Sequence, residues 1–229
     1  MNFNEEYYRS NKQDKDRIGL FFYKNLINYY FKPKAILDYG CGTGYLLKRL
    51  SRLRTVQSSY GFEINEFAIN EAKNNSKNTN VISDLKKINS ESIDTIISLH
   101  VIEHLSNKEL EQIIKSFRRI LNKNGNIVFA TPAKDGLAHK IKQKTWIGFS
   151  DKTHINLKTF KEWKNFFNSN GLKIIKSSND GLWDFPYNHN KFTMGRILIF
   201  IKMIFQILTG RLLLKYDQGE TFIFILQFE

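Results

Sequence analysis

The chain has few of the residues that cross-link or interrupt a fold. Its 229 residues include one cysteine and three prolines. A single cysteine can form no internal disulfide, which excludes a disulfide framework and fits a reducing compartment. The first ten residues contain no apolar stretch, which argues against a secretion signal. We therefore expect a cytoplasmic protein, and its length favours a single domain over residues 1–229.

Acidic residues are scarce relative to basic ones. The sequence has 35 Lys and Arg against 22 Asp and Glu, which gives a net charge of +13. The basic residues are spread along the chain instead of forming one block, so we attribute the charge to overall composition. A basic surface still attracts phosphate groups and anionic membranes.

Short β-branched runs alternate with segments of helical periodicity. Two helices have readable starts, because Ser106 with Glu109 and Thr159 with Glu162 fit the capping box. Several of the runs are apolar at successive positions, as strands covered on both faces are. The alternation predicts an α/β, Rossmann-like and mostly parallel seven-stranded sheet with helices on both faces. The expected strands are 35–39, 59–62, 80–83, 95–99, 126–130, 172–177 and 222–228.

Two segments fall outside this alternation. Residues 1–34 include an amphipathic helix at 18–31, and we expect them to form an N-terminal helical cap. Residues 178–220 are too long for a hairpin and predict a helical insertion or lid. The cofactor-binding core would then be 35–177 and the last strand 221–229.

The strongest motif follows the first expected strand and reads ILDYGCGTG over residues 36–44. Its alternate glycines let the backbone turn sharply and approach a ligand at a helix N-terminus. Glu63 follows the second strand at about the spacing of a ribose-binding carboxylate. A nicotinamide dinucleotide loop would read G-x-G-x-x-G, whereas this loop has the shorter spacing and Asp38 upstream. That pattern favours a ligand with an ammonium group over a pyrophosphate.

Over residues 34–177 this arrangement resembles the class I S-adenosylmethionine-dependent methyltransferases of the small-molecule type. The resemblance implies that S-adenosylmethionine is the cofactor, that the glycine loop wraps its methionine part, and that Glu63 binds the ribose. It further implies that Asp84 and the Leu85 amide meet the adenine, with Leu99 and His100 near the methyl group. The cofactor-binding residues implied in this way are Asp38, Gly40, Cys41, Gly42, Gly44, Glu63, Asp84, Leu85, Leu99 and His100.

Several of these residues also have simpler interpretations. Asp84 could cap a turn, Cys41 would contribute its backbone, and His104 would be a hydrogen-bonded framework residue. The five histidines and one cysteine show no C-x-x-C or H-E-x-x-H spacing, so we expect no metal site.

The acceptor is expected to meet the segment after the fifth strand. Its D-x-x-H pattern at Asp151 and His154 resembles small-molecule members of the family, including quinone-type and sugar-modifying enzymes. His154 is therefore the candidate general base, with a structural role in the loop as the alternative. The expected acceptor is a sugar, a lipid-linked glycan intermediate or a quinone-like lipid. Aromatic candidates for the acceptor pocket are Trp146, Phe149, Trp183, Phe185 and Tyr187.

Two other functions stay open. The positive charge suggests an RNA or other nucleic-acid methyltransferase. Against this, the fourth strand ends in Ser-Leu-His and lacks the Asn/Asp-Pro-Pro-Tyr signature of many such enzymes, and no RNA-binding module is visible. The third hypothesis is a non-catalytic scaffold that binds S-adenosylmethionine. The intact glycine loop argues against lost binding, but it says nothing about lost transfer.

The longest apolar run, residues 197–208, is too short to cross a membrane, which takes about 18 such residues. On a helix, Lys202, Gln206 and Thr209 would share one narrow polar stripe. We expect a lid helix or a homodimer contact, and the alternative is a peripheral membrane contact through residues 196–215.

Overall fold

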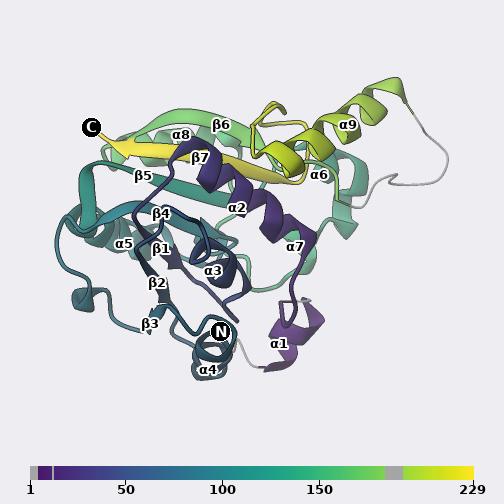
Figure 1. The fold of residues 1–229 in the computed structure, drawn as a ribbon. Helices are drawn as coiled ribbons and strands as arrows, with labels where there is room; N and C mark the ends of the chain where they lie inside the picture. Colours follow the sequence, from purple (N-terminus) through teal and green to yellow (C-terminus); the bar gives the residue numbers. More distant parts are fainter. Residues whose placement is uncertain (1–4, 12, 184–192) are drawn as a thin grey trace.

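The computed structural model describes residues 5–11, 13–183 and 193–229. Within these residues a seven-stranded sheet has the order β3-β2-β1-β4-β5-β7-β6 (Figure 1). All seven expected strands are present, and the largest differences are the earlier start of β4 and the longer β5. The strands are β1 (Ala35–Tyr39), β2 (Ser58–Phe62), β3 (Asn80–Ile82), β4 (Ile93–Leu99), β5 (Leu121–Pro132), β6 (Leu172–Asn179) and β7 (Thr221–Phe228).

The sheet is parallel except around β7, which runs antiparallel to both β5 and β6. This confirms the prediction of a mostly parallel sheet. The strand order changes direction between β1 and β4, because β2 and β3 lie on one side and β5 on the other. Ligands bind open parallel sheets at such a switch point, beyond the carboxyl ends of the strands.

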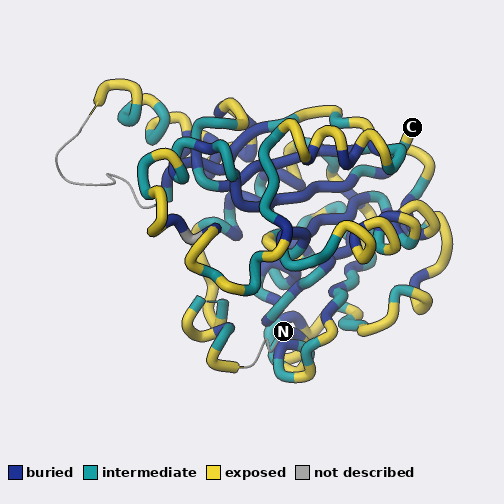
Figure 2. The backbone as a smooth tube through the Cα atoms, turned by 180° about the vertical axis from the view of Figure 1, so that it is seen from behind, coloured by how far each residue is buried: buried dark blue, intermediate teal, exposed yellow. Residues whose placement is uncertain are grey.

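Helices cover both faces of the sheet, as expected. One face packs against α5 (Asn107–Ile120) and α8 (Phe160–Ser169), and the other packs against α2 (Ile18–Tyr30), α3 (Tyr45–Leu50) and α9 (Met194–Thr209). Successive strand residues point to opposite faces, so the central strands β1, β4, β5 and β7 are buried at consecutive positions over most of their length and are mainly dark blue in Figure 2. The other helical elements are α1 (Glu5–Ser10), α4 (Glu66–Asn75), α6 (Leu137–Lys142), α7 (Ile147–Ser150), η1 (Leu85–Lys87), η2 (Ile102–His104) and η3 (Gln143–Thr145).

Local sequence signals set the ends of two of these helices. Both predicted capping boxes are formed, by Ser106 with Glu109 at the start of α5 and by Thr159 with Glu162 at the start of α8. Gly171 follows α8 with a φ of +66°, a left-handed conformation that glycine adopts without strain.

The expected insertion contains α9, which packs on α2 and projects from the body of the molecule (Figure 1). Gln206 faces inward and is fully buried, whereas Lys202 and Thr209 are exposed, so the polar stripe is divided. We call the side of α9 that points away from α2 its outer face. Its exposed apolar side chains are Met194, Leu198, Ile201, Ile204, Phe205 and Leu208. Among the described residues, no helix combines the length and apolar character that crossing a bilayer requires.

Candidate active site

A cavity of about 480 Å³ lies at the switch point, beyond the ends of β1 and β4. The glycine loop contributes Gly40, Cys41 and Gly42 to its lining. His100, His104 and His154 line the same cavity, together with Asp151 and Asp180. The volume is typical of a small-molecule site.

The glycine loop depends on backbone conformations that other residues adopt only with strain. Gly40, Gly42 and Gly44 have φ values of +75°, +52° and +82°. A Cβ atom at Gly40 would also lie 2.3 Å from Cγ2 of Val101, closer than any real contact. The amides of Gly40 and Cys41 both donate to the carbonyl of Phe62, which attaches the loop to the end of β2.

Asp38 is a buried acid at the start of this loop. Its side chain is 2% exposed, and its Oδ2 has no hydrogen-bond partner among the described residues. Burial and, next, the charge of Glu63 raise the pKa of Asp38 to about 8. A positively charged ligand group in the cavity would offset both effects by favouring the ionised carboxylate.

Glu63 connects the second strand to the glycine loop. Its Oε2 accepts a hydrogen bond from the Gly42 amide at 3.0 Å, and its Oε1 accepts from the amides of Ile64 and Asn65. Asp84 is exposed and caps η1 by accepting from the Lys86 amide at 2.9 Å. Of the predicted cofactor residues, Asp38, Gly40, Cys41, Gly42, Leu99 and His100 line the cavity, and Gly44, Glu63, Asp84 and Leu85 lie outside its lining.

The N-terminal segment covers the glycine loop. Tyr8 of α1 is buried and packs on the ring of Phe67 in α4, and the Thr43 hydroxyl donates to the carbonyl of Gln13. Tyr7, Arg17 and Tyr23 from the same segment line the cavity. Both segments outside the alternation, 1–34 and 178–220, therefore contribute to the cavity lining. From the second segment, Asp180, Trp183 and Glu220 line the cavity, but no described residue of α9 does.

The described aromatic candidates for the acceptor pocket lie in three different environments. Trp183 lines the cavity, whereas Trp146 is fully buried in a small cluster with Ala138 and Leu182, and Phe149 is exposed. Phe185 and Tyr187 lie outside the described residues.

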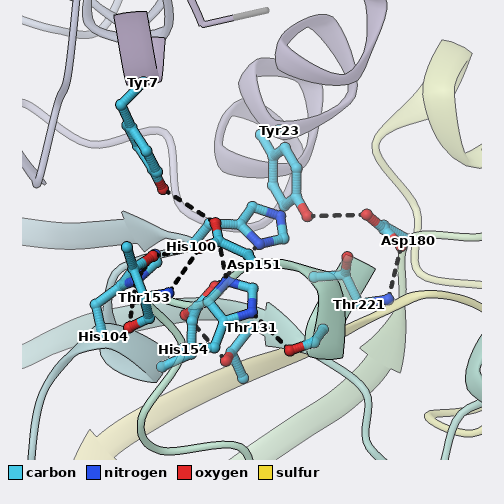
Figure 3. A network of polar contacts seen from close by, with 12 residues as sticks. Tyr7, Tyr23, His100, His104, Thr131, Asp151, Thr153, His154, Asp180 and Thr221 are labelled. Carbon is cyan, nitrogen blue, oxygen red and sulfur yellow. Dashed lines mark hydrogen bonds and ion pairs between the residues drawn. The ribbon is translucent and has the colours of Figure 1, made fainter. Parts of the chain in front are cut away.

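Glu103 connects several residues of the polar network beside the cavity, among them His100 and Thr131, which Figure 3 labels. It is fully buried, lies 3.2 Å from Nδ1 of His100 through Oε1, and accepts from the Thr131 hydroxyl at 3.0 Å through Oε2. Burial alone would raise the pKa of Glu103, but the bond to His100 and the nearby His104 and His154 hold it below its ordinary value. Glu103 also raises the pKa of His100 against the opposing effect of burial.

The segment that carries His154 is hydrogen-bonded to the backbone of Glu103. The amides of Ile155 and Asn156 both donate to the carbonyl of Glu103. The ring centroids of His104 and His154 lie 4.8 Å apart as a result. Sequence reasoning had selected His154 and treated His104 as framework. Nothing local could have paired two histidines that are fifty positions apart.

Both rings have a defined orientation. Nδ1 of His154 lies 2.9 Å from the carbonyl of Gly148, and Nδ1 of His104 lies 3.2 Å from the carbonyl of Thr153. Because a carbonyl oxygen only accepts, the neutral rings carry their protons on Nδ1 and a lone pair on Nε2. Nε2 of His154 is 3.8 Å from Oδ2 of Asp151, which also accepts from the Tyr7 hydroxyl at 3.3 Å. Glu103, His104 and His154 each offer one ligand atom within 4.8 Å of the others, a grouping that could hold a metal ion.

Comparison with known proteins identifies the family. A family profile described as a methyltransferase domain matches residues 11–177, well over half of the chain. The chain belongs to the class I S-adenosylmethionine-dependent methyltransferases.

Its curated relatives are distant. An uncharacterised methyltransferase of Bacillus cytotoxicus is 35% identical over 42% of this chain and 45% of its own length. A malonyl-[acyl-carrier protein] O-methyltransferase of Legionella pneumophila is 26% identical over 66% of this chain and 54% of its own length. The chain thus spans about half the length of the curated relatives it matches.

Solved structures show the same fold over nearly the whole chain. A methyltransferase from Archaeoglobus fulgidus matches with a TM-score of 0.61 and 20% identity over 96% of this chain and 98% of that one. A plantazolicin methyltransferase, solved with S-adenosylhomocysteine and a substrate analogue, matches with a TM-score of 0.65 and 17% identity over 96% and 89%.

The residues of the loop fit the family's cofactor. Gly40 and Gly42 line the cavity with backbone at positive φ, where a larger residue would be strained, and a Cβ atom at Gly40 would also clash. The orphaned Oδ2 of Asp38 is a buried acceptor suited to the ammonium group of the cofactor's methionine part.

Proposed function

We propose that this methyltransferase transfers a methyl group from S-adenosylmethionine to an oxygen of a small molecule. The observation that carries the proposal is that the glycine loop with Asp38 and the imidazoles of His104 and His154 line one cavity. An oxygen acceptor is favoured because a hydroxyl must lose a proton. The imidazoles of His104 and His154 provide proton acceptors in this cavity. The Legionella relative, named as an O-methyltransferase, supports the same class of acceptor atom. A sugar, a lipid-linked glycan intermediate or a quinone-like lipid are the leading candidates.

Asp38 and the glycine loop would hold the cofactor's amino acid part. Glu63 would bind the ribose through lone pairs not used by the backbone amides, Asp84 and Leu85 would meet the adenine, and Leu99 and His100 would lie near the methyl group. When bound, S-adenosylmethionine supplies an activated methyl group for direct displacement. The chain's task is then to hold the acceptor oxygen in line, which accounts for about 7–11 kcal/mol in favourable cases.

His154 would accept the proton of the acceptor hydroxyl. Its Nδ1 is held by the Gly148 carbonyl, so the Nε2 lone pair is the basic site. Asp151, 3.8 Å from Nε2, would stabilise the imidazolium that forms.

The test is the His154→Gln variant with tritiated S-adenosylmethionine and fractionated metabolite extracts. We expect turnover to fall by roughly 10²–10⁴, the range for a general base. Calorimetry should show unchanged affinity for S-adenosylhomocysteine. Lys152→Gln, a change at an exposed neighbour, is the matched control. Loss of cofactor affinity together with turnover would make His154 a loop-organising residue, full turnover would remove it from the site, and label in the RNA fraction would overturn the small-molecule acceptor.

We further propose that the outer face of α9 lies on an anionic lipid surface. Its apolar side chains are exposed, Phe205 by 57%, and Lys202 and Arg211 are exposed beside them. Ile199 of α9 packs on the small hydrophobic cluster that contains Leu182. The next residue in the sequence, Trp183, lines the cavity, so α9 lies near it. A lipid-like acceptor could therefore reach the site from this side. A second copy of the chain is the competing cover for this face.

A further inference from the structure

Three side chains that can donate an electron pair lie close together beside the cavity and come from two separate segments. Glu103 and His104 come from η2, and His154 comes from the loop after α7. One ligand atom from each lies within 4.8 Å of the others, and Glu103 is fully buried. The backbone bonds of Ile155 and Asn156 to the Glu103 carbonyl hold the two segments together.

The hydrogen bonds around this cluster indicate which of its atoms carry lone pairs. Each histidine uses Nδ1 to donate to a backbone carbonyl, which leaves Nε2 as an electron-pair donor. Both oxygens of Glu103 act as acceptors, toward His100 and Thr131. An Nδ1–H group bonded to a carbonyl is the usual arrangement around a metal-binding histidine, because it fixes the ring and increases its basicity.

We infer that Glu103, His104 and His154 form a binding site for a divalent transition-metal cation such as Zn²⁺ or Mn²⁺. Two imidazoles and one carboxylate suit these cations, and three protein ligands leave a coordination position for a substrate oxygen. Ligand atoms at about 2.1 Å from one tetrahedral ion lie about 3.4 Å apart, so atoms now within 4.8 Å of one another need to approach by at most about 1.4 Å. His104, His154 and Asp151 line the cavity, so the open position faces the acceptor.

The inference rests on the proposed function and changes one of its steps. With the cation bound, the Nε2 lone pair of His154 is a ligand and no longer a base. The cation would instead lower the pKa of a coordinated acceptor hydroxyl, as Zn²⁺ lowers the pKa of bound water to about 7. The hydroxyl proton would pass to the Asp151 carboxylate, and the oxygen would bond to the methyl carbon through its electron pair. The bond between that carbon and the cofactor's sulfur would break at the same time, and the sulfur would keep that bond's electron pair and leave as S-adenosylhomocysteine. Without the cation, His154 is the proton acceptor.

The experiment measures cation binding without cofactor or acceptor. The full chain, with any affinity tag removed and metals stripped by EDTA, is titrated with ZnCl₂ and separately with MnCl₂. Calorimetry should show one site per chain, and the electron paramagnetic resonance signal of free Mn²⁺ should fall in parallel. His104→Gln and Glu103→Gln should each weaken binding by at least about 100-fold, since losing even an outer-shell partner costs 10–100-fold. His139→Gln, outside the cluster, should bind as the wild type does, and the circular dichroism of each variant reports its folding.

The outcomes separate this inference from the proposed function. Binding weaker than about 1 mM, or binding that folded Glu103→Gln and His104→Gln variants retain, would overturn the metal site. Methyl transfer that persists in metal-stripped protein and is lost in His154→Gln would then favour the general base. Cation binding that is lost in the folded Glu103→Gln and His104→Gln variants supports the site even if no acceptor is methylated.

Discussion

Asp38 shows how one residue can oppose folding and favour binding. The unfolded chain ionises this carboxyl near pH 3.8, whereas burial and Glu63 keep it protonated in the folded protein up to about pH 8. The folded state therefore binds the proton more tightly than the unfolded state does. Its contribution to stability is most favourable below pH 3.8 and is lost progressively as the pH rises toward 8.

Asp38→Asn should consequently stabilise the protein while weakening the cofactor site. At pH 7 to 9 we expect the free energy of unfolding to increase by a few kcal/mol at most, since one pKa unit corresponds to about 1.4 kcal/mol. The difference should vanish near pH 4. Calorimetry should show at least tenfold weaker binding of S-adenosylhomocysteine, because the negative partner of the ammonium group is lost. A variant less stable at pH 9, or one that binds equally well, would contradict this account of Asp38.

What could be predicted for single residues depended on how local the signal was. The glycine loop, Asp38 and Glu63 lie in or near one motif, so their positions at the ends of β1 and β2 followed from the sequence. The bonds of Glu63 to three backbone amides did not, because they depend on how two loops meet. Likewise, the sequence indicated His154 but could not place His104 against it.

At the scale of elements, α9 is the segment whose pattern was least informative. Gln206 belongs by periodicity to a polar stripe, yet it is buried and connects α9 to two other segments. Its Nε2 donates to the Asn179 carbonyl at 3.0 Å, and its Oε1 accepts from the amides of Leu213 and Leu214 at 2.6 and 2.9 Å. Periodicity identifies a face but not its partner, so the sequence left this contact open. The strands and capped helices were predictable because their signals are contained within each element.

Gln206→Leu should therefore destabilise the chain despite adding an apolar side chain to a buried position. The change leaves one carbonyl and two amides without the side-chain partner. We expect a loss of about 2–4 kcal/mol, because each unsatisfied buried group costs roughly 1–3 kcal/mol. Urea denaturation followed by circular dichroism measures it. Lys202→Gln, at an exposed position on the same helix, is the control and should change stability by no more than about 0.5 kcal/mol. Equal stability of the two variants would show that the buried Gln206 amide contributes nothing.

At the scale of the whole molecule, charge and apolar exposure act in the same direction. The net charge of +13 attracts anionic surfaces over a distance of about one Debye length, and the outer face of α9 supplies the contact itself. Lysines alone would bind weakly and be displaced by salt. An exposed apolar helix face alone would associate with many partners. Together they favour an anionic membrane, as an interfacial helix with basic residues does.

The final prediction concerns this surface. The wild-type chain should sediment with vesicles containing phosphatidylglycerol and not with pure phosphatidylcholine. Phe205→Ser combined with Leu208→Ser should weaken vesicle binding by at least tenfold, since burying each of these side chains contributes about 1.5–3 kcal/mol when complete. Ile175→Ser, which alters a half-exposed apolar side chain on β6, should leave binding unchanged. Analytical ultracentrifugation of the same proteins distinguishes a lipid surface from a second copy of the chain as the partner of this face. If the double variant dissociates a wild-type dimer and binds vesicles as before, the outer face of α9 meets a second copy of the chain instead of lipid.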